Sequence, residues 1–411
     1  MNSRKELVER FLRYVQVPSQ SCAAQKSVPS SEGQRTLGRL LEQELKGMGV
    51  TEVFCDEKPA LLYAFLKGNT KASSVGFVSH LDTIDISLSP QVRPQILHYE
   101  GGDVLLNAAQ NLKIKLAEHP ELEKYRGQDI VFSDGTSVLG ADNKAAMAVI
   151  MTMLSVLCAD PSIPHGDIYV AFVPDEEIGL RGSRLLDLER FKPDFAYTID
   201  CCALGELVYE TFNAGRAEIS IRGVSAHPMS AKGVMINPIL VARDFIDMFD
   251  SEQTPECTCA KEGFWWFETL HSDVTNCQII LQIRDHDKAR YEWRKQVVMD
   301  HIERLKKLHS RAVIKCELFD TYENIANNVK REDKPVALLY QAFATLGIKA
   351  NTYAMRGGTD GSMLSARGLV TPNYFTGAEN FHNAAEFLPL DSFEKSFLVT
   401  MKLLELAAKP A

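Results

Sequence analysis

Short apolar runs and longer amphipathic segments alternate along the chain. Three runs rich in β-branched and aromatic residues are predicted to be strands, at 74–79, 168–174 and 195–200. Apolar residues at helical spacing predict helices that accompany these strands, at 33–47, 143–158 and 183–191. Strands that alternate with helices are typical of βαβ units, in which helices cover both faces of a sheet. The pattern therefore predicts an α/β domain.

The middle of the chain has a different pattern. Alternating residues predict strands at 216–222, 277–283 and 312–319, and helical spacing predicts helices at 237–249 and 288–308. This order indicates a smaller α+β unit inserted into the first domain. The α/β pattern then returns, with a helix expected at 335–346 and a short strand at 368–375. We therefore expect a discontinuous outer domain at 1–211 and 327–411 and an inserted domain at 212–326.

Composition and charge narrow the class of protein. The 411 residues are 45% hydrophobic and 24% charged, which is typical of a folded chain of two or three domains. A net charge of −9 argues against a nucleic-acid or anionic-membrane partner. The apolar run at 145–159 is shorter than the about 20 residues that span a bilayer, and the helical stretch at 4–17 is too charged for a signal peptide. Nine cysteines without a CxxC pair are typical of a reducing compartment, so we expect a cytoplasmic protein.

Side chains that bind metals follow the predicted strands. His80 and Asp82 come at the end of the first strand, and two residues apart they face the same side of an extended segment. Such a pair suits a histidine ligand whose ring is oriented by a carboxylate. Glu176 and Glu177 follow the second strand, and Asp200 ends the third. Because ligands bind beyond the carboxyl ends of parallel strands, we expect these side chains at one edge of the sheet.

Each of these motifs has a simpler interpretation when it stands alone. An HxD sequence is common in surface loops, and Asp142 has the sequence context of a helix N-cap. Three acids at 175–177 are typical of a solvated turn, and a single late histidine, His382, carries little information. Taken together, two histidines and three carboxylates, one of them shared, are the ligand set of two zinc ions about 3.5–4 Å apart.

Seven motifs resemble those of the peptidase T family of tripeptide aminopeptidases, which belongs to a wider family of dizinc peptidases and deacylases. They read SHLDT, LGADNKAA, FVPDEEIG, AYTID, RGVSAHPMSAKGVMIN, RGGTDGSMLS and FTGAENFH. The resemblance extends from about residue 5 to about residue 408 and includes the long stretch at 94–140. It implies a zinc-peptidase fold with a lid or dimerisation domain. It also implies an enzyme that releases the N-terminal residue from short peptides, with tripeptides as the expected substrates.

The resemblance also implies the ligands of two zinc ions per chain. His80 and Asp200 are expected to bind one ion, Glu177 and His382 the other, and Asp142 to bridge both. Cobalt or manganese is expected to substitute for zinc. The peptide bond between Asp142 and the next residue is expected to be cis.

Three further residues have catalytic roles by the same resemblance. Asp82 is expected to hold His80, and Glu176 to act as the general base for the attacking water. His227, in the inserted domain, is expected to help hold the oxyanion in its own chain or in that of a dimer partner. A structural histidine before a turn-forming proline is the alternative for this position.

Substrate contacts are expected from Asn237, Arg284 and Arg356. Both arginines are candidates for binding a peptide carboxylate, since a guanidinium group pairs with it through two hydrogen bonds. One departure concerns the rim of the site. Peptidase T usually has Gly-Lys-His-Glu after the last histidine, whereas this chain has Asn-Ala-Ala-Glu at 383–386. The stretch at 256–262 is also unusual, so the peptide preference stays open.

Two alternatives to a tripeptide aminopeptidase are kept. The first is another amide hydrolase of the same family, such as a dipeptidase, a carboxypeptidase or an acyl-amino-acid deacylase. The second is a peptide-binding homologue without catalytic activity. The stretch at 94–140 favours the aminopeptidase, and the presence of both Asp82 and Glu176 argues against the inactive homologue. A homodimer through the inserted domain is a further expectation.

Overall fold

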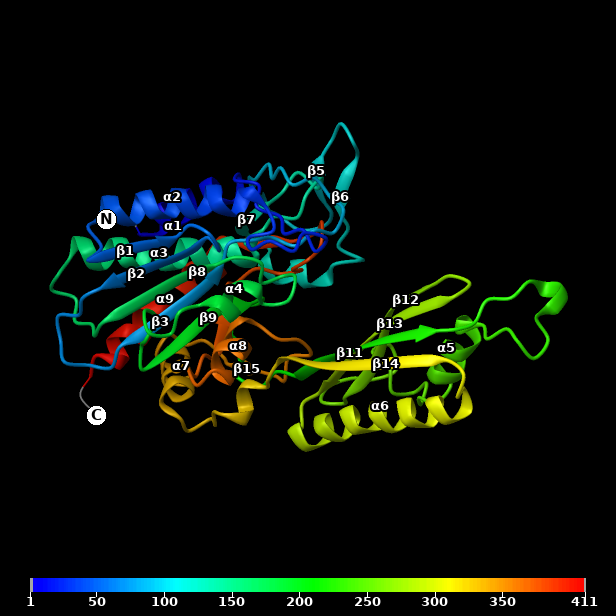
Figure 1. Ribbon diagram of the computed structural model, residues 1–411. Coiled ribbons are helices and arrows are strands. Elements are labelled where there is room, and N and C mark those ends of the chain that lie inside the picture. The colour runs from blue at the N-terminus through cyan, green and yellow to red at the C-terminus, as the bar shows by residue number, and fades with distance from the viewer. Residues whose placement is uncertain (1–2, 410–411) are drawn as a thin grey trace. The chain divides into compact units, whose positions relative to one another are not determined.

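The computed structural model describes residues 3–409, which form two compact units (Figure 1). The first unit contains the chain up to Tyr209, the segment Val329–Tyr353 and the chain from Thr359 onward. The second contains Glu210–Asn328 together with the short segment Ala354–Gly358. Residues 1, 2, 410 and 411 of the expected outer domain lie outside the described residues.

An eight-stranded sheet lies at the centre of the first unit (Figure 1). Its strand order is β1 (Glu52–Asp56), β2 (Leu61–Leu66), β8 (Ile168–Val173), β3 (Val75–His80), β9 (Phe195–Cys201), β16 (Asn373–Phe375), β10 (Glu206–Val208) and β15 (Asn351–Thr352). The four neighbours β8, β3, β9 and β16 run parallel, and β2 and β10 pair with them antiparallel. The carboxyl ends of the four parallel strands therefore meet at one edge.

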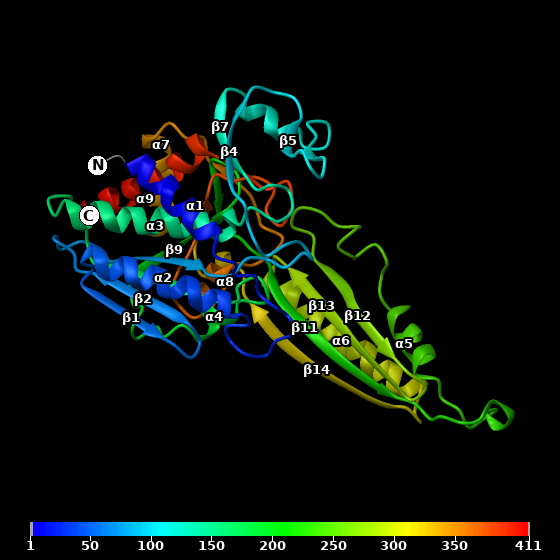
Figure 2. The same cartoon turned by 90° about the horizontal axis from the view of Figure 1, so that it is seen from above.

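Helices cover both faces of this sheet, which confirms the predicted α/β fold (Figure 2). Helix α3 (Ala141–Ala159) packs against β3 and β9, and α1 (Ser3–Val15) and α9 (Leu390–Ala407) pack on α3. On the same side, α2 (Glu32–Met48) covers β1 and β2, and α7 (Lys334–Thr345) packs against α9. The opposite face has two short helices, α4 (Arg181–Leu185) and α8 (Asp360–Ala366).

Helix α3 is the most apolar helix of the unit and its main core element. By length and composition it passes as a membrane span, the one such helix found among residues 3–409, but 89% of that window is buried inside the fold. Its apolar residues face other helices on one side and the sheet on the other, so they form a protein core.

Two predicted elements differ from the structure. The helix expected at 183–191 ends at Leu185, because the Asp187 N–H donates to the Tyr63 hydroxyl at 3.0 Å and the Asp187 carboxylate accepts the Glu189 N–H. The strand expected at 368–375 is regular only at Asn373–Phe375. Pro372, which has no N–H for a ladder, still accepts from Thr198 through its carbonyl.

The stretch at 94–140 adds a small region to the first unit. Strand β4 (Gln95–Tyr99) pairs with β7 (Gln128–Phe132), and β7 pairs with β17 (Phe387–Pro389). Between β4 and β7 lie a hairpin of β5 (Val104–Asn107) and β6 (Leu112–Ile114) and a 3₁₀ turn at Pro120–Tyr125. The ring of Phe387 contacts those of Tyr125 and Phe132, with centroids 5.7 and 5.8 Å apart. This packing brings the region beside the chain that precedes α9.

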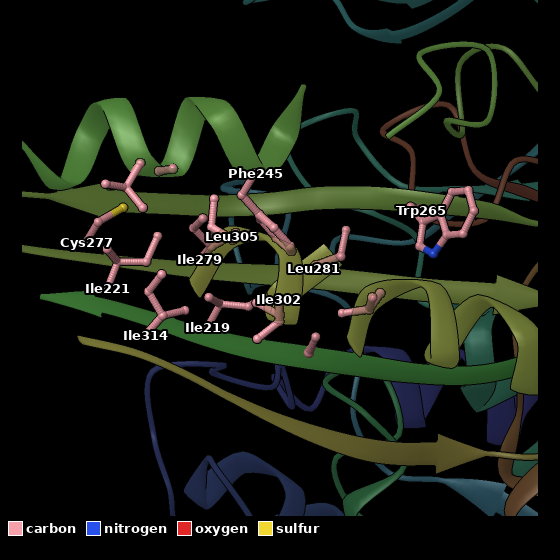
Figure 3. Close-up of a cluster of buried hydrophobic side chains, with 14 of the residues drawn as sticks. Ile219, Ile221, Phe245, Trp265, Cys277, Ile279, Leu281, Ile302, Leu305 and Ile314 are labelled. Atoms are coloured by element: carbon pink, nitrogen blue, oxygen red, sulfur yellow. The ribbon is translucent and has the colours of Figure 1, made fainter. Parts of the chain in front are cut away.

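The second unit is a four-stranded antiparallel sheet with two helices on one face (Figure 3). Its strand order is β12 (Phe264–Ser272), β13 (Asn276–Asp285), β11 (Asn213–Arg222) and β14 (Val313–Tyr322). Alternate residues of the strands, such as Ile219 and Ile279, bury their side chains against α5 (Pro238–Ile246) and α6 (Lys288–Leu308). The edge strand β12 was not predicted from the sequence.

Candidate active site

The first strand end positions His80 and Asp82. His80 is the last residue of β3 and is 1% exposed, and its Nδ1 lies 3.0 Å from the Asp82 carbonyl oxygen and 3.4 Å from Asp82 Oδ1. This contact leaves Nε2 directed away from Asp82. Nε2 lies 2.9 Å from Asp142 Oδ1 and 3.7 Å from Asp200 Oδ1. The structure therefore joins side chains from three elements at this imidazole.

Asp142 lies between the two histidines. Its Oδ1 faces His80, and its Oδ2 lies 3.0 Å from His382 Nε2, so each carboxylate oxygen faces one imidazole. Glu386 holds the backbone here, since its carboxylate accepts the Gly140 N–H at 2.7 Å and the Asp142 N–H at 3.1 Å. The peptide bond from Asp142 to Asn143 is cis, as the resemblance implied.

The turn after β8 presents Glu176 and Glu177. The Asp82 carboxylate accepts the Glu176 N–H at 3.0 Å with one oxygen and the Glu177 N–H at 3.1 Å with the other. Asp175 begins the turn with a φ of 57°, a conformation that residues other than glycine rarely adopt. Hydrogen bonds from Ser30 and Gln34 to its carboxylate hold it there. Asp82 therefore supports both the His80 ring and the acidic turn.

Asp200 is placed by two asparagines. Its N–H donates to Asn373 Oδ1 at 2.7 Å, and its Oδ1 accepts from Asn143 Nδ2 at 2.8 Å. Asn143 follows the cis peptide, so one side chain ties the Asp142 backbone to the end of β9. The Ser79 hydroxyl donates to the Asn143 side chain and completes this support.

His382 comes from the loop after β16. Its Nε2 lies 3.0 Å from Glu177 Oε1 and 3.0 Å from Asp142 Oδ2, and its side chain is 43% exposed. The backbone at His382 has a φ of 59°. This ligand candidate is therefore the most accessible of the set and is held in an uncommon backbone conformation.

The electrostatics of the cluster follow from its crowded acids. Burial and then the charge of Asp142 raise the pKa of Glu177 to about 8 and that of Asp200 to about 6. Burial also raises the pKa of Glu176 well above its ordinary value. Burial acts against charge at Asp142 as well, but hydrogen bonds from His382 and His80 hold its pKa far below the usual range.

These donor atoms fit a pair of divalent cations. His80, Asp142 and Glu177 each place one donor atom within 4.8 Å of the others. Two ligands on one tetrahedral zinc ion, each about 2.0–2.1 Å from it, lie about 3.3 Å apart, close to the 2.9–3.7 Å between neighbouring donors here. Three carboxylates and two imidazoles, which bind a metal through an unprotonated nitrogen, also suit two ions of charge +2. The set therefore matches the chemistry of the expected metal pair.

The other predicted site residues lie in the second unit. His227 is exposed, and its Nδ1 accepts the Met229 N–H at 3.2 Å, so the ring proton is on Nε2. Asn237 is the N-cap of α5, since its Oδ1 accepts the Ile239 N–H at 3.0 Å. Arg284 Nη1 donates to the carbonyl oxygens of Gly215 and Ile283.

Arg356 also belongs to the second unit, in the segment Ala354–Gly358. Its Nη1 donates to the carbonyl oxygens of Ala260 and Glu262, and its Nη2 donates to Thr258 Oγ1 at 2.7 Å. Among the described residues no hydrogen bond is found for the Arg356 Nε–H, so this group is available to a carboxylate. The unusual stretch at 256–262 thus holds the guanidinium group of Arg356.

Sequence reasoning missed the residues that support the ligands. None of these supporting residues is itself a proposed metal ligand or catalytic group: Asn143, Asp175, Asn373 and Glu386. Their hydrogen-bond partners are up to 246 residues away along the chain. The available signal was position only, because each lies within ten residues of a ligand candidate. Their hydrogen bonds to backbone groups depend on the folded arrangement of the loops.

The comparisons with known proteins agree with this geometry. A model of peptidase family M20/M25/M40 matches residues 140–406. A peptidase T-like protein of Rhizobium meliloti is 49% identical over 409 residues, which cover 99% of this chain and 100% of the relative. A peptidase T of Fusobacterium nucleatum is 41% identical over 414 residues, with 100% of both chains covered.

Solved structures share the fold. A tripeptidase of Staphylococcus aureus matches with a TM-score of 0.78 at 22% identity, and 99% of both chains is covered. A dinuclear metal binding peptidase of family M20 from Bacillus subtilis matches with a TM-score of 0.65 at 14% identity, with 98% of both chains covered. At these identities the similarity concerns the arrangement of the elements.

Proposed function

Because the chain belongs to peptidase family M20/M25/M40, we propose that it is a metal-dependent aminopeptidase that releases the N-terminal residue of short peptides, with tripeptides as its main substrates. One observation carries the proposal: four parallel strand ends and the start of α3 bring two imidazoles and three carboxylates to one point. The names of the relatives support the peptide substrate.

We propose two zinc ions per chain, replaceable by cobalt or manganese. His80 and Asp200 would hold one ion, Glu177 and His382 the other, and Asp142 both. Such a pair lowers the pKa of a water molecule and polarises a carbonyl group. The Bacillus subtilis structure named above supports a dinuclear site.

Glu176 is the proposed general base. Its backbone is fixed by Asp82, which directs the turn without using the Glu176 carboxylate. That carboxylate takes a proton from the attacking water and passes it to the nitrogen of the leaving amine. Asp82 in turn keeps the His80 ring oriented.

His227 is the proposed donor to the developing oxyanion. Because His227 Nδ1 accepts the Met229 N–H, its Nε2–H is an exposed donor. Arg284 and Arg356 are the proposed partners of the substrate carboxylate, and Asn237 is a further proposed contact. Each arginine keeps its Nε–H for this purpose, counted over the described residues.

Assembly and compartment are proposed as well. A homodimer through the second unit would follow the family resemblance. The nine cysteines are all free thiols, which supports a reducing compartment such as the cytoplasm.

A panel of peptides tests the proposed function. Purified protein would receive di-, tri- and tetrapeptides, N-acetylated tripeptides and tripeptide amides, each with the native ions and after chelation followed by zinc. We expect release of the first residue from free tripeptides, loss of activity on chelation and recovery with zinc. Preferred cleavage of acylated amino acids or of C-terminal residues would instead indicate the deacylase or carboxypeptidase alternative. Full activity in metal-stripped protein would contradict the metal-dependent mechanism.

A further inference from the structure

The loop that carries His382 is short and held in an unfavourable conformation. Backbone hydrogen bonds between Glu379 and Phe387, in both directions, close its base. Inside it, Asn380 and His382 have φ values of 60° and 59°. Left-handed backbone is unfavourable for most residues, and asparagine tolerates it better than histidine. Such a conformation persists where its surroundings enforce it.

The enforcing contacts come from the 3₁₀ turn at Pro120–Tyr125, in the small region between β4 and β7. Glu121 Oε1 accepts from Asn380 Nδ2 at 2.6 Å, and His119 Nδ1 lies 3.1 Å from the same carboxylate oxygen. The Tyr125 hydroxyl donates to Glu379 Oε1 at 2.6 Å. Two consecutive loop residues are thus held by one turn that lies more than 250 residues away in sequence.

The Asn380 amide also spans the ligand. Its Nδ2 also lies 3.3 Å from the carbonyl oxygen of Ala385, which follows His382 in the loop, and 3.3 Å from His119 Nδ1. Glu121 therefore orients the side chain that ties both flanks of the loop together. Glu121 is an anion in this position: burial acts to raise its pKa, but hydrogen bonds from Asn380, its own backbone and His119 outweigh burial and lower the pKa.

We propose that Glu121 is a positioning residue for His382, which it holds at its ligand position through Asn380. The inference rests on the proposed dinuclear site. It gives the stretch at 94–140 a function, because the 3₁₀ turn within this stretch would determine how tightly the cation at His382 is bound. Partners of metal ligands typically contribute 10–100-fold to metal affinity. The cation on the His80 side should keep its affinity, because His80 and Asp200 are held by Asp82, Asn143 and Asn373, which lie outside this loop.

Cobalt titration of metal-stripped protein provides the test. Binding would be followed by calorimetry and by the visible absorption of Co²⁺, and H382A identifies the binding event that depends on this loop. In E121A we expect that event to weaken by about 10–100-fold with an altered absorption band, while the other event keeps its affinity. E121Q keeps an acceptor oxygen for Asn380 and should restore most of the affinity.

A matched control and a second variant guard against a general loss of structure. Glu118 lies on the same segment with its side chain 61% exposed, paired with Lys115, so E118A should bind cobalt as the wild type does. N380G keeps the left-handed backbone accessible but removes the amide, and it should weaken the same event. The double variant E121A/N380G should lose no more affinity than N380G alone, because N380G already removes the contact between Asn380 and Glu121.

The outcomes separate this inference from the proposed function. Equal affinities of E121A, E118A and the wild type for both cations would overturn the role of Glu121. If E121A does not fold, N380G provides the test instead. Wild-type cobalt affinity in N380G would also overturn the positioning role of Glu121. A wild-type chain that binds fewer than two cations would instead refute the dinuclear site.

Discussion

Asp82 shows how one residue organises a site without contacting the reacting atoms. Its side chain is fully buried, and both its oxygens accept backbone N–H groups of the acidic turn while it adjoins His80. A buried carboxylate needs such partners, because unpaired burial of charge is costly. The position of the proposed general base and the orientation of a proposed ligand thus depend on the same carboxylate.

Removal of the Glu176 carboxylate separates catalysis from metal binding. E176A should keep two cations, since the ligand set contains no Glu176 atom, but its kcat should fall by at least about 10²–10⁴-fold. Metal analysis and steady-state kinetics on a tripeptide check both statements. A variant that keeps more than about a tenth of the wild-type rate would refute the role of general base.

Replacement of His227 tests the donor in the second unit. H227A should lower kcat and kcat/KM together by about 10²–10³-fold, because a transition-state hydrogen bond is lost. The cation content should stay at two. M229A is the matched control: Met229 is 89% exposed, and its backbone N–H persists in the variant. Wild-type turnover by H227A would leave this histidine a structural role only.

At the scale of elements, the direction of the strands explains the site. β3, β8, β9 and β16 are parallel neighbours, so the residues that follow them meet although they are far apart in sequence. The first residues of α3 close the site from one face. The strands are mostly buried, and the ligand candidates lie either at the last residues of a strand or in the segments that follow.

The hydrophobic core of the second unit should stabilise that unit without affecting cation binding in the first unit. Phe245 on α5 is 0% exposed and packs its ring edge-on against Phe249 and Phe267. F245A should lower the free energy of unfolding of this unit by about 3–5 kcal/mol through lost burial and a residual cavity. Chemical denaturation measures this loss, with L270A, at a side chain that is 43% exposed, as the control.

Cation binding should be retained in F245A, because all five proposed ligands belong to the first unit. Loss of cations from the folded variant would mean that the integrity of the second unit governs the metal site. The same titration on L270A should match the wild type.

At the scale of the whole molecule, the proposed cations should stabilise the fold. Binding to the folded chain at a free concentration of 100 times Kd contributes about 2.7 kcal/mol per site. Zinc added to stripped protein should therefore raise Tm by roughly 5 °C or more in calorimetry. D142A lacks the shared carboxylate and should show a much smaller rise. An unchanged Tm in the wild type would contradict two ligand-held cations.

Local patterns in the sequence were enough to predict part of this architecture. Helix 288–308 is found with the predicted bounds, since Asp287 caps its first turn and its buried residues recur at helical spacing. The α/β fold and the resemblance to the peptidase T family are confirmed. The ligand candidates could be recognised because the end of a strand and the spacing within a motif are both patterns of a few neighbouring residues.

Other features depended on contacts that no local pattern contains. The helix predicted at 183–191 ends early because the Tyr63 hydroxyl, from β2, accepts a backbone N–H. The strand β12 had no clear sequence pattern because it is an edge strand with much of its length exposed. The segment Ala354–Gly358 joins the second unit although it lies beyond the expected boundary.

The support of His382 illustrates the division most clearly. The sequence by itself determined which residue types surround the site, because ligand chemistry and strand periodicity act over a few residues. Only the tertiary structure decided that Glu121 meets Asn380 and that Glu386 meets the backbone of Asp142, across 259 and 244 residues. Hydrogen bonds need their partners within about 3 Å, and that distance is set by the packing of the whole unit.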